Sequence, residues 1–431
     1  MRRGLWWLAL IAMSVATPAR AQVSDALRDR VNQLVAKLDA EKIEARDAAQ
    51  KALVELGPRI KPLLDDAEKS GSAERKARLA RVREALGKAE ENTNLGASKI
   101  TIKQKGVRLS EAIKLLQAQS GNTINDLREQ EGVDVTNPAL DLEIVDKPFF
   151  EALDLVAEQA GVLPSFFTGD GSIGLMGAAM PGGAPRTTKP MVVYSGPFRV
   201  QFKQISAVRD FDTGTATSNA QFELAWEPRL RPMLLAFKPD SVQATTDEGK
   251  PVPRSVMDES DDVALRPENP AAEVNLNLVA PDRSAKELKS FKVKGEVTLP
   301  AGLKTFNFKS LEAKDDTIKE GDIAVTLEST TIEEGIWRVN VTVAYPGGGP
   351  AFESYRQGLF NNRLWLQKAD GSRFEHNGGF NNTGSDDGKL SFEYLFVDAP
   401  GKLADYGLVY ETPSKVVTIP LEFEFKKIPL P

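Results

Sequence analysis

The only histidine of the 431-residue chain, His376, limits the acid–base and metal chemistry that the protein could carry out. It lies between Glu375 and Asn377, just before two glycines, in a pattern typical of a turn. Because the chain also has no cysteine, a zinc site built from histidine and cysteine is excluded, and a Ser-His-Asp triad would have to use this turn residue. No nucleophile-elbow or Walker-type motif is present. We therefore expect His376 to be a solvent-exposed hairpin residue, and we predict no enzymatic activity, no catalytic residue, no cofactor-binding residue and no cofactor.

Carboxylates are the remaining source of chemistry. Two of them are enough to hydrolyse a glycosidic bond, but the chain has 61 acidic residues, so their presence alone selects no pair. Three aspartate-rich turns could offer oxygen ligands to calcium: Asp210 to Gly214, Asp258 to Asp262, and Asp386 to Gly388. None has the spacing of a defined calcium loop, and aspartate beside glycine is explained by turn chemistry. We predict no metal site and leave open whether a structural calcium is present.

Aromatic and amide side chains could form a binding surface. Trp226, Trp337 and Trp365 each lie in an alternating apolar segment, which favours the core over a sugar-stacking surface. The loop 345–350, followed by Phe352 and Tyr355, is a better surface candidate, and Asn361-Asn362 and Asn377 to Asn382 are expected to face it. An ordinary long hairpin loop is the alternative, so the ligand-binding residues stay unknown from sequence.

A repeated segment organises the region from Ser98 to Met176. Two copies of a strand-then-helix pattern recur at an offset of 40 residues. In each copy apolar residues first alternate, as in a half-buried strand, and then follow helical spacing up to a glycine, Gly121 or Gly161. The pattern predicts a small α+β domain at 96–178, in the order strand, helix, strand, strand, helix, strand, with both helices on one face of one short sheet.

The two copies, "ITIKQKGVRLSEAIKLLQAQSG" and "LDLEIVDKPFFEALDLVAEQAG", resemble the short N-terminal (STN-like) domain of secretins and TonB-dependent receptors. The resemblance covers roughly a fifth of the chain. It implies a periplasmic interaction module, and that family offers no catalytic residues to transfer. Since the pore-forming region of a secretin is missing, the resemblance suggests as one alternative a soluble component of an export or pilus machine.

Helical spacing dominates residues 22–95. The stretch "ARDAAQKALVELGPRIKPLLDDAEKSGSAERKARLARVREAL" resembles a HEAT-type helical pair. Two or three helices are too few for a solenoid with a binding groove, so a compact helical cap or adaptor is expected. Its basic cluster, Arg75 to Arg83, is expected to be a solvated helix face, because acidic residues surround it.

The remainder of the chain has the pattern of β-structure. A linker at 179–190, rich in glycine and proline, precedes short alternating segments. We expect two immunoglobulin-like β-sandwiches, at 191–300 and 301–431, with the polar stretch 247–270 as an exposed excursion. The fold class is thus multi-domain: an all-α segment, a small α+β domain and two all-β sandwiches.

Residues 1–21 have the features of a signal peptide, with Arg2 and Arg3, an apolar run from Leu5 to Val15, and small residues before Gln22. We expect export to the periplasm or cell surface, without a membrane-spanning segment after cleavage. A net charge of −6 indicates no nucleic-acid partner. The favoured function is a non-enzymatic envelope protein that contacts an envelope protein or a cell-wall polymer. The alternative is a glycan-binding or glycan-hydrolysing protein that uses a sandwich face. The oligomeric state is not predicted.

Overall fold

The computed structural model describes residues 25–57, 60–64, 71–130, 135–177, 189–238, 240–255, 261–266, 268–345, 362–386 and 388–431. The expected signal peptide and nearly all of the expected linker lie outside these ranges, as do loop residues 346–361. The structure is mostly β, with several sheets and few helices. The chain divides into two compact units, one up to Asn94 and one from Leu95 onward.

The first unit is helical. Its helices are α1 (Asp25–Lys37), α2 (Ile43–Glu55) and α4 (Ala73–Leu95). Apolar residues at helical spacing bury one face of each helix in a common core, as their periodicity predicts. The core residues are Val31, Leu34, Val35, Leu38, Ala49, Leu53, Ile60, Leu64, Leu79, Val82 and Leu86.

The second unit begins with the α+β region, whose elements follow the order expected from the repeat. They are β1 (Lys99–Arg108), α5 (Leu109–Ser120), β2 (Ile124–Asp126), β3 (Ala139–Pro148), α6 (Phe149–Ala160), β4 (Val162–Ser165) and β5 (Ile173–Gly177). The expectation of one sheet is wrong. Strands β1 and β3 pair antiparallel as one sheet, and β2, β5 and β4 form another. Among the described strands, the first strand of each copy therefore pairs with its counterpart alone.

The two copies make matched contacts at the same offset of 40 residues. Gln119 of α5 donates to the carbonyl of Thr101 at 3.1 Å, and Gln159 of α6 donates to the carbonyl of Asp141 at 3.1 Å. Both helices end at a glycine with positive φ, 72° at Gly121 and 66° at Gly161, a conformation that other residues adopt only with strain. The repeat in the sequence is thus a repeat in hydrogen bonding as well as in apolar pattern.

Two sheets then face each other across one core. The first has the order β13 (Ala271–Val279), β8 (Ala216–Trp226), β7 (Phe198–Arg209) and β6 (Met191–Ser195). The second contains β11 (Pro251–Val252), β10 (Val242–Thr246), β14 (Glu287–Phe308), β22 (Tyr406–Pro429), β18 (Arg363–Lys368) and β19 (Arg373–Glu375). Strands β9 (Leu234–Phe237) and β12 (Asp261–Ala264) join its side. The core of this first β-lobe contains phenylalanines from both sheets, among them Phe202, Phe222, Phe291, Phe423 and Phe425.

A second β-lobe lies along the other half of β14 and β22. Its own sheet has the order β15 (Asp316–Glu320), β16 (Ile323–Glu333), β17 (Ile336–Ala344), β21 (Lys389–Val397) and β20 (Phe380–Asp386). All pairings in the two lobes are antiparallel among the described strands. The β-rich part of the expected fold class is therefore present.

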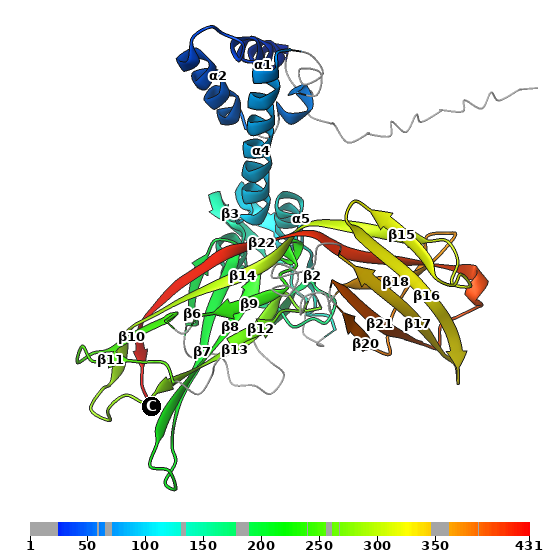
Figure 1. The fold of residues 1–431 in the computed structure, drawn as a ribbon. Helices are drawn as coiled ribbons and strands as arrows, with labels where there is room; N and C mark the ends of the chain where they lie inside the picture. Colours follow the sequence, from blue (N-terminus) through cyan, green and yellow to red (C-terminus); the bar gives the residue numbers. More distant parts are fainter. Residues whose placement is uncertain are drawn as a thin grey trace, which may run out of the picture. The chain divides into compact units, whose positions relative to one another are not determined.

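The structure differs from the expected lobe boundary between residues 300 and 301, which falls inside β14. Strands β14 and β22 run the length of both lobes (Figure 1), paired from Glu287↔Pro429 to Phe308↔Leu408. Phe423 and Phe425, assigned from sequence to the second lobe, pack in the first, because the chain's last strand returns alongside β14.

The polar stretch 247–270 also differs from the expected exposed excursion. Its described part contributes β11 and β12, and the side chains of Val252 and Leu265 are buried in the first core. Most of the other described residues of the stretch are exposed, as expected.

Candidate functional site

The structure places His376 against an aromatic wall and not in solvent, so the expected exposed position is wrong. Its ring lies 5.4 Å from the ring of Tyr394 and 6.3 Å from that of Phe396. Burial lowers the pKa of His376 below its ordinary value, although Glu375 and Glu268 act in the opposite direction. The half-buried imidazole thus packs on aromatic rings of the second β-lobe.

The three tryptophans lie in buried positions. Trp226, Trp337 and Trp365 are 1%, 4% and 3% exposed, as their alternating segments predict. Trp365 is flanked by two guanidinium groups, from Arg363 at 5.5 Å and Arg373 at 4.4 Å from its ring centre. None of the three indoles offers a free face for stacking on a sugar. Of the loop candidate, only Tyr345, Asn362 and Asn377 to Asn382 lie within the described residues.

In the described aspartate turn at Asp210, the carboxylate accepts hydrogen bonds from backbone amides. The carboxylate of Asp210 accepts the amide N–H groups of Asp212 at 2.8 Å and Thr213 at 3.0 Å, and these backbone donors lower the pKa of Asp210. Asp258 and Asp387 lie outside the described residues. In the part of the chain that the structure describes, no group of three or more histidine, aspartate or glutamate residues could hold a metal ion.

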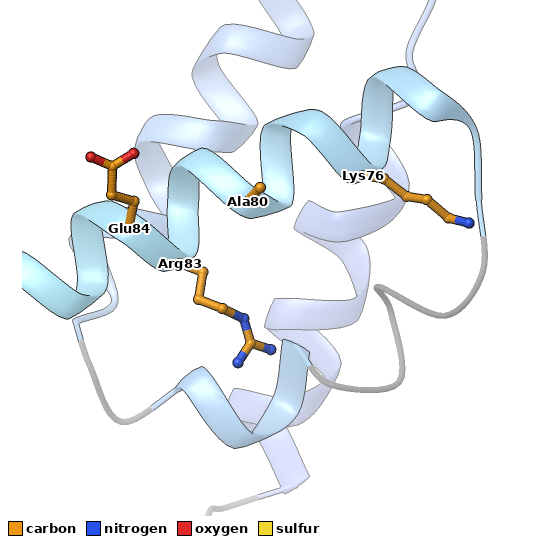
Figure 2. A pocket seen from close by; sticks show the side chains of 4 residues that line it. All are labelled: Lys76, Ala80, Arg83 and Glu84. Carbon is orange, nitrogen blue, oxygen red and sulfur yellow. The ribbon is translucent and has the colours of Figure 1, made fainter. Parts of the chain in front are cut away.

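The basic cluster of α4 is not the wholly solvated face that the sequence predicted: one of its arginines is buried, and other residues lie at the surface. Arg78 is 5% exposed and binds Asp47 at 2.7 Å and Glu74 at 2.6 Å, so it ties α4 to α2. Lys76, Ala80, Arg83 and Glu84 line a shallow surface pocket, and Figure 2 shows the side chains of Arg83 and Glu84 pointing in opposite directions. All four of these residues belong to α4.

A deeper cleft lies in the second unit, between α6 with β4 on one side and strands β6, β7 and β8 on the other. Its volume is about 460 Å³. The apolar wall comes mainly from the end of α6, from β4 and from the start of β6: Leu155, Ala157, Val162, Leu163, Pro164, Pro190 and Val192. The facing wall is the outer face of the sheet, with Tyr194 on β6, Arg199, Gln201 and Lys203 on β7, and Glu223 on β8.

A chain of charge pairs forms the floor of this cleft. Arg199 is 4% exposed, and its Nε lies 2.9 Å and 3.2 Å from the two carboxylate oxygens of Asp154. The same guanidinium lies 3.7 Å from Glu223, which is 6% exposed and binds Lys203 at 2.9 Å. Since buried charges are tolerated only when paired, the four groups stabilise one another in a fixed arrangement.

Two aromatic rings extend the network. Tyr194 donates its hydroxyl proton to Asp154 at 2.6 Å, and burial together with the negative charge of Asp154 raises the pKa of this phenol. The guanidinium of Arg199 lies 5.5 Å from the ring centre of Phe166, within cation–π range. Asp154 thus accepts hydrogen bonds from a guanidinium and a phenol and links α6 to the sheet.

The lining of the cleft is balanced in charge. Four cationic side chains, Lys147, Lys189, Arg199 and Lys203, accompany four acidic ones, Glu151, Asp154, Glu158 and Glu223. Lys147 binds Glu151 at 3.4 Å and Lys189 binds Glu158 at 3.6 Å, so the rim is paired like the floor. The arrangement can hold a ligand by shape, apolar contact and directed hydrogen bonds.

None of the floor residues was predicted from the sequence as a site residue. Arg199 and Glu223 occupy outward positions of alternating strands, where a charged residue is ordinary, and Asp154 lies on a different element. Only the pairing of β7 with β8, with Gln201 opposite Glu223, and the position of α6 over them bring these residues together.

No family model matches the chain, and no curated protein matches it significantly. Within the described residues, no helix combines the length and the apolar character needed to cross a membrane.

Proposed function

We propose that this chain is a non-enzymatic binding protein of the bacterial envelope, and that the cleft between α6 and the sheet β6–β7–β8 receives part of a protein or cell-wall partner. The observation that carries the proposal is the paired floor of the cleft. Asp154 is paired with Arg199 and Glu223 with Lys203. Asp154 also accepts a hydrogen bond from the hydroxyl of Tyr194. Because their partners fix the positions of both carboxylates, these groups can orient a ligand by directed hydrogen bonds.

The fold supports the same proposal. A pseudo-symmetric α+β region that resembles the short N-terminal domain of secretins would provide an interaction module beside the cleft, and α6 belongs to both. We propose further that the two β-lobes are immunoglobulin-like and act as spacers or contact modules. Export is proposed from the pattern of residues 1–21, with two arginines followed by an apolar run.

The test introduces one charge into the apolar wall. Leu163 is half-buried on β4 and lines the cleft, so Leu163→Arg places a long cation where the partner is expected to pack. Ile332, 51% exposed on β16 of the second β-lobe, supplies the matched control Ile332→Arg. Mature full-length protein is incubated with isolated cell walls and with solubilised envelope, and the retained fraction is measured.

We expect wild type and Ile332→Arg to retain the partner equally and Leu163→Arg to retain at least tenfold less. Equal retention by the two arginine variants would remove the cleft as the recognition site. Glycan hydrolysis by the wild type that disappears in Asp154→Asn would replace the proposal with the enzymatic alternative.

A further inference from the structure

The outer face of the sheet that floors the cleft continues beyond it as a surface of amide and hydroxyl side chains. Strands β7, β8 and β13 lie side by side (Figure 1), and their register aligns the outward residues in rows. Gln204 lies opposite Gln221, which lies opposite Asn275, and the next row is Ser206, Asn219 and Asn277. We call these six residues the amide face.

The amide face begins where the cleft ends. Gln201 and Glu223 line the cleft and are cross-strand partners, and Gln204 and Gln221 form the next row along the same two strands. Each of the six side chains is exposed or half-buried. The cleft and the amide face therefore form one continuous surface on the same side of the sheet.

The opposite sheet of the same lobe has a different chemistry. On the outward side of β14 and β22, lysine lies opposite glutamate: Lys292 is paired with Glu424, and Lys294 with Glu422 at 3.5 Å between charged groups. Alternating charge is the usual solvent-facing pattern of a sheet. Because the two faces belong to one lobe, the absence of charge from the six positions of the amide face is a local property and not a general one of this chain.

We infer that the amide face, together with the cleft, binds an uncharged glycan strand. This inference rests on the proposed function and specifies the partner. Asn219 donates to Asn277 at 2.9 Å, and Gln221 donates to the flanking Glu273 at 3.3 Å. An amide nitrogen carries two N–H donors and an amide oxygen two lone pairs, so the remaining donors and acceptors of the face can pair with sugar hydroxyl groups. Tyr194 at the cleft end adds an amphipathic ring of the kind that packs on a sugar.

Other partners fit the face less well. Protein interfaces are centred on apolar or aromatic residues, and the two rows of the amide face contain none; the exposed Val208 and Val279 lie in the row beyond them. Nucleic acids and acidic polymers need cations for their charges, but Arg199 and Lys203 are bound to Asp154 and Glu223. A neutral polymer requires neither an apolar centre nor unpaired cations.

The experiment is calorimetric titration of the mature full-length protein with neutral hexasaccharides of β-linked glucose and of β-linked N-acetylglucosamine, and with a hexamer of galacturonic acid as the charged counterpart. We expect at least one neutral hexasaccharide to bind, the corresponding disaccharide to bind at least tenfold more weakly, and the acidic hexamer to bind at least tenfold more weakly.

Two variants map the site. Gln204→Arg/Asn275→Arg adds two cations to the exposed ends of one row of the amide face and is expected to weaken binding at least tenfold. Ser290→Arg/Thr418→Arg adds two cations to the outer side of the opposite sheet and is expected to leave binding unchanged. Should the first variant fail to fold, side-chain amide shifts in the NMR spectrum of wild-type protein on adding the hexasaccharide would locate the site instead.

The inference is overturned if neither neutral hexasaccharide binds at millimolar concentration. It is also overturned if the protein prefers the acidic hexamer, or if the two double-arginine variants bind the hexasaccharide equally well. If Leu163→Arg still abolishes partner retention in that case, the cleft remains a recognition site and only the glycan assignment falls. If Leu163→Arg has no effect either, both fall together.

Discussion

The buried carboxylate of Glu227 is a site where one substitution should strongly destabilise the second unit. Glu227 follows the buried Trp226 and is 0% exposed. It accepts hydrogen bonds from the amide of Ser98 at 2.8 Å, the hydroxyl of Ser98 at 2.6 Å, Asn122 Nδ2 at 3.0 Å and Arg229 Nε at 2.8 Å. One carboxylate thus joins the chain just before β1 and the end of α5 to the end of β8.

Glu227→Ala removes this acceptor from all four donors. Breaking a buried ion pair by deleting one partner typically destabilises a protein by about 3–5 kcal/mol. The side chain of Arg229 is 21% exposed, so water compensates part of its loss. We therefore expect the free energy of unfolding of the second unit to fall by about 3 kcal/mol. Urea denaturation followed by tryptophan fluorescence measures the change, and faster hydrogen exchange at the Ser98 amide shows that it is local.

The exposed pair between Lys238 and Glu296 provides the control. Its charged groups are 2.7 Å apart, as close as those of Glu227 and Arg229, but the side chains are 68% and 48% exposed. Solvent screens such a pair, so Glu296→Ala should change the free energy of unfolding by less than about 1 kcal/mol. If the two variants are equally stable, burial does not set the strength of these pairs and the reasoning is refuted.

Three further predictions concern Asp126, His376 and two leucines of the α+β core. Arg128 holds the pKa of Asp126 below its usual range, so the stability that this pair contributes is complete above the unfolded pKa of about 3.9 and is lost as the pH falls further. Asp126→Asn should therefore make the melting temperature decline less steeply at acid pH. An unchanged decline would contradict this. Burial lowers the pKa of His376, so stability should rise as the pH increases through about 6.5, and the single imidazole should titrate below that value by NMR; a pKa at or above it would show an exposed ring. Leu116→Ala and Leu153→Ala each leave a cavity at a fully buried site and should destabilise the α+β region by about 2–5 kcal/mol, measured by denaturation; a loss below 1 kcal/mol at both would contradict their place in one core.

The order of elements in the α+β region could be predicted because local periodicity determines it. Alternating apolar residues before Leu109 and Phe149, and glycines after each helix, specify strand, helix and helix end. The split into two sheets could not be predicted, since pairing depends on which strands meet. The same pattern is compatible with one sheet or with two.

That the two β-lobes share strands β14 and β22 could not be predicted from the sequence, for a similar reason. The alternation from Phe291 to Leu299 and the alternation near Phe306 look like separate short strands, because Pro300, Ala301 and Gly302 interrupt them. In the structure β14 continues across this interruption with a shift in register between Pro300 and Gly302. Proline and glycine in a strand mark a bulge as well as an end, and the sequence does not distinguish the two.

The cleft is a product of tertiary structure alone. Asp154, Arg199 and Glu223 come from a helix and two strands, and no one sequence motif contains all three. What the sequence does contain is the run of outward amides on β8, at Asn219 and Gln221, where lysine and glutamate would be more usual. That bias is visible before the fold is known, although its meaning needs the register of the sheet.

The most direct test of the cleft as a recognition site is site-specific photo-crosslinking in the native envelope. A photoreactive residue replaces Val192, which lines the cleft, and in a second strain replaces the exposed Ile332 as control. A recognition site predicts one discrete crosslinked product, a protein or a cell-wall fragment, from position 192 and none from position 332. No product from position 192, or the same product from both positions, would contradict it.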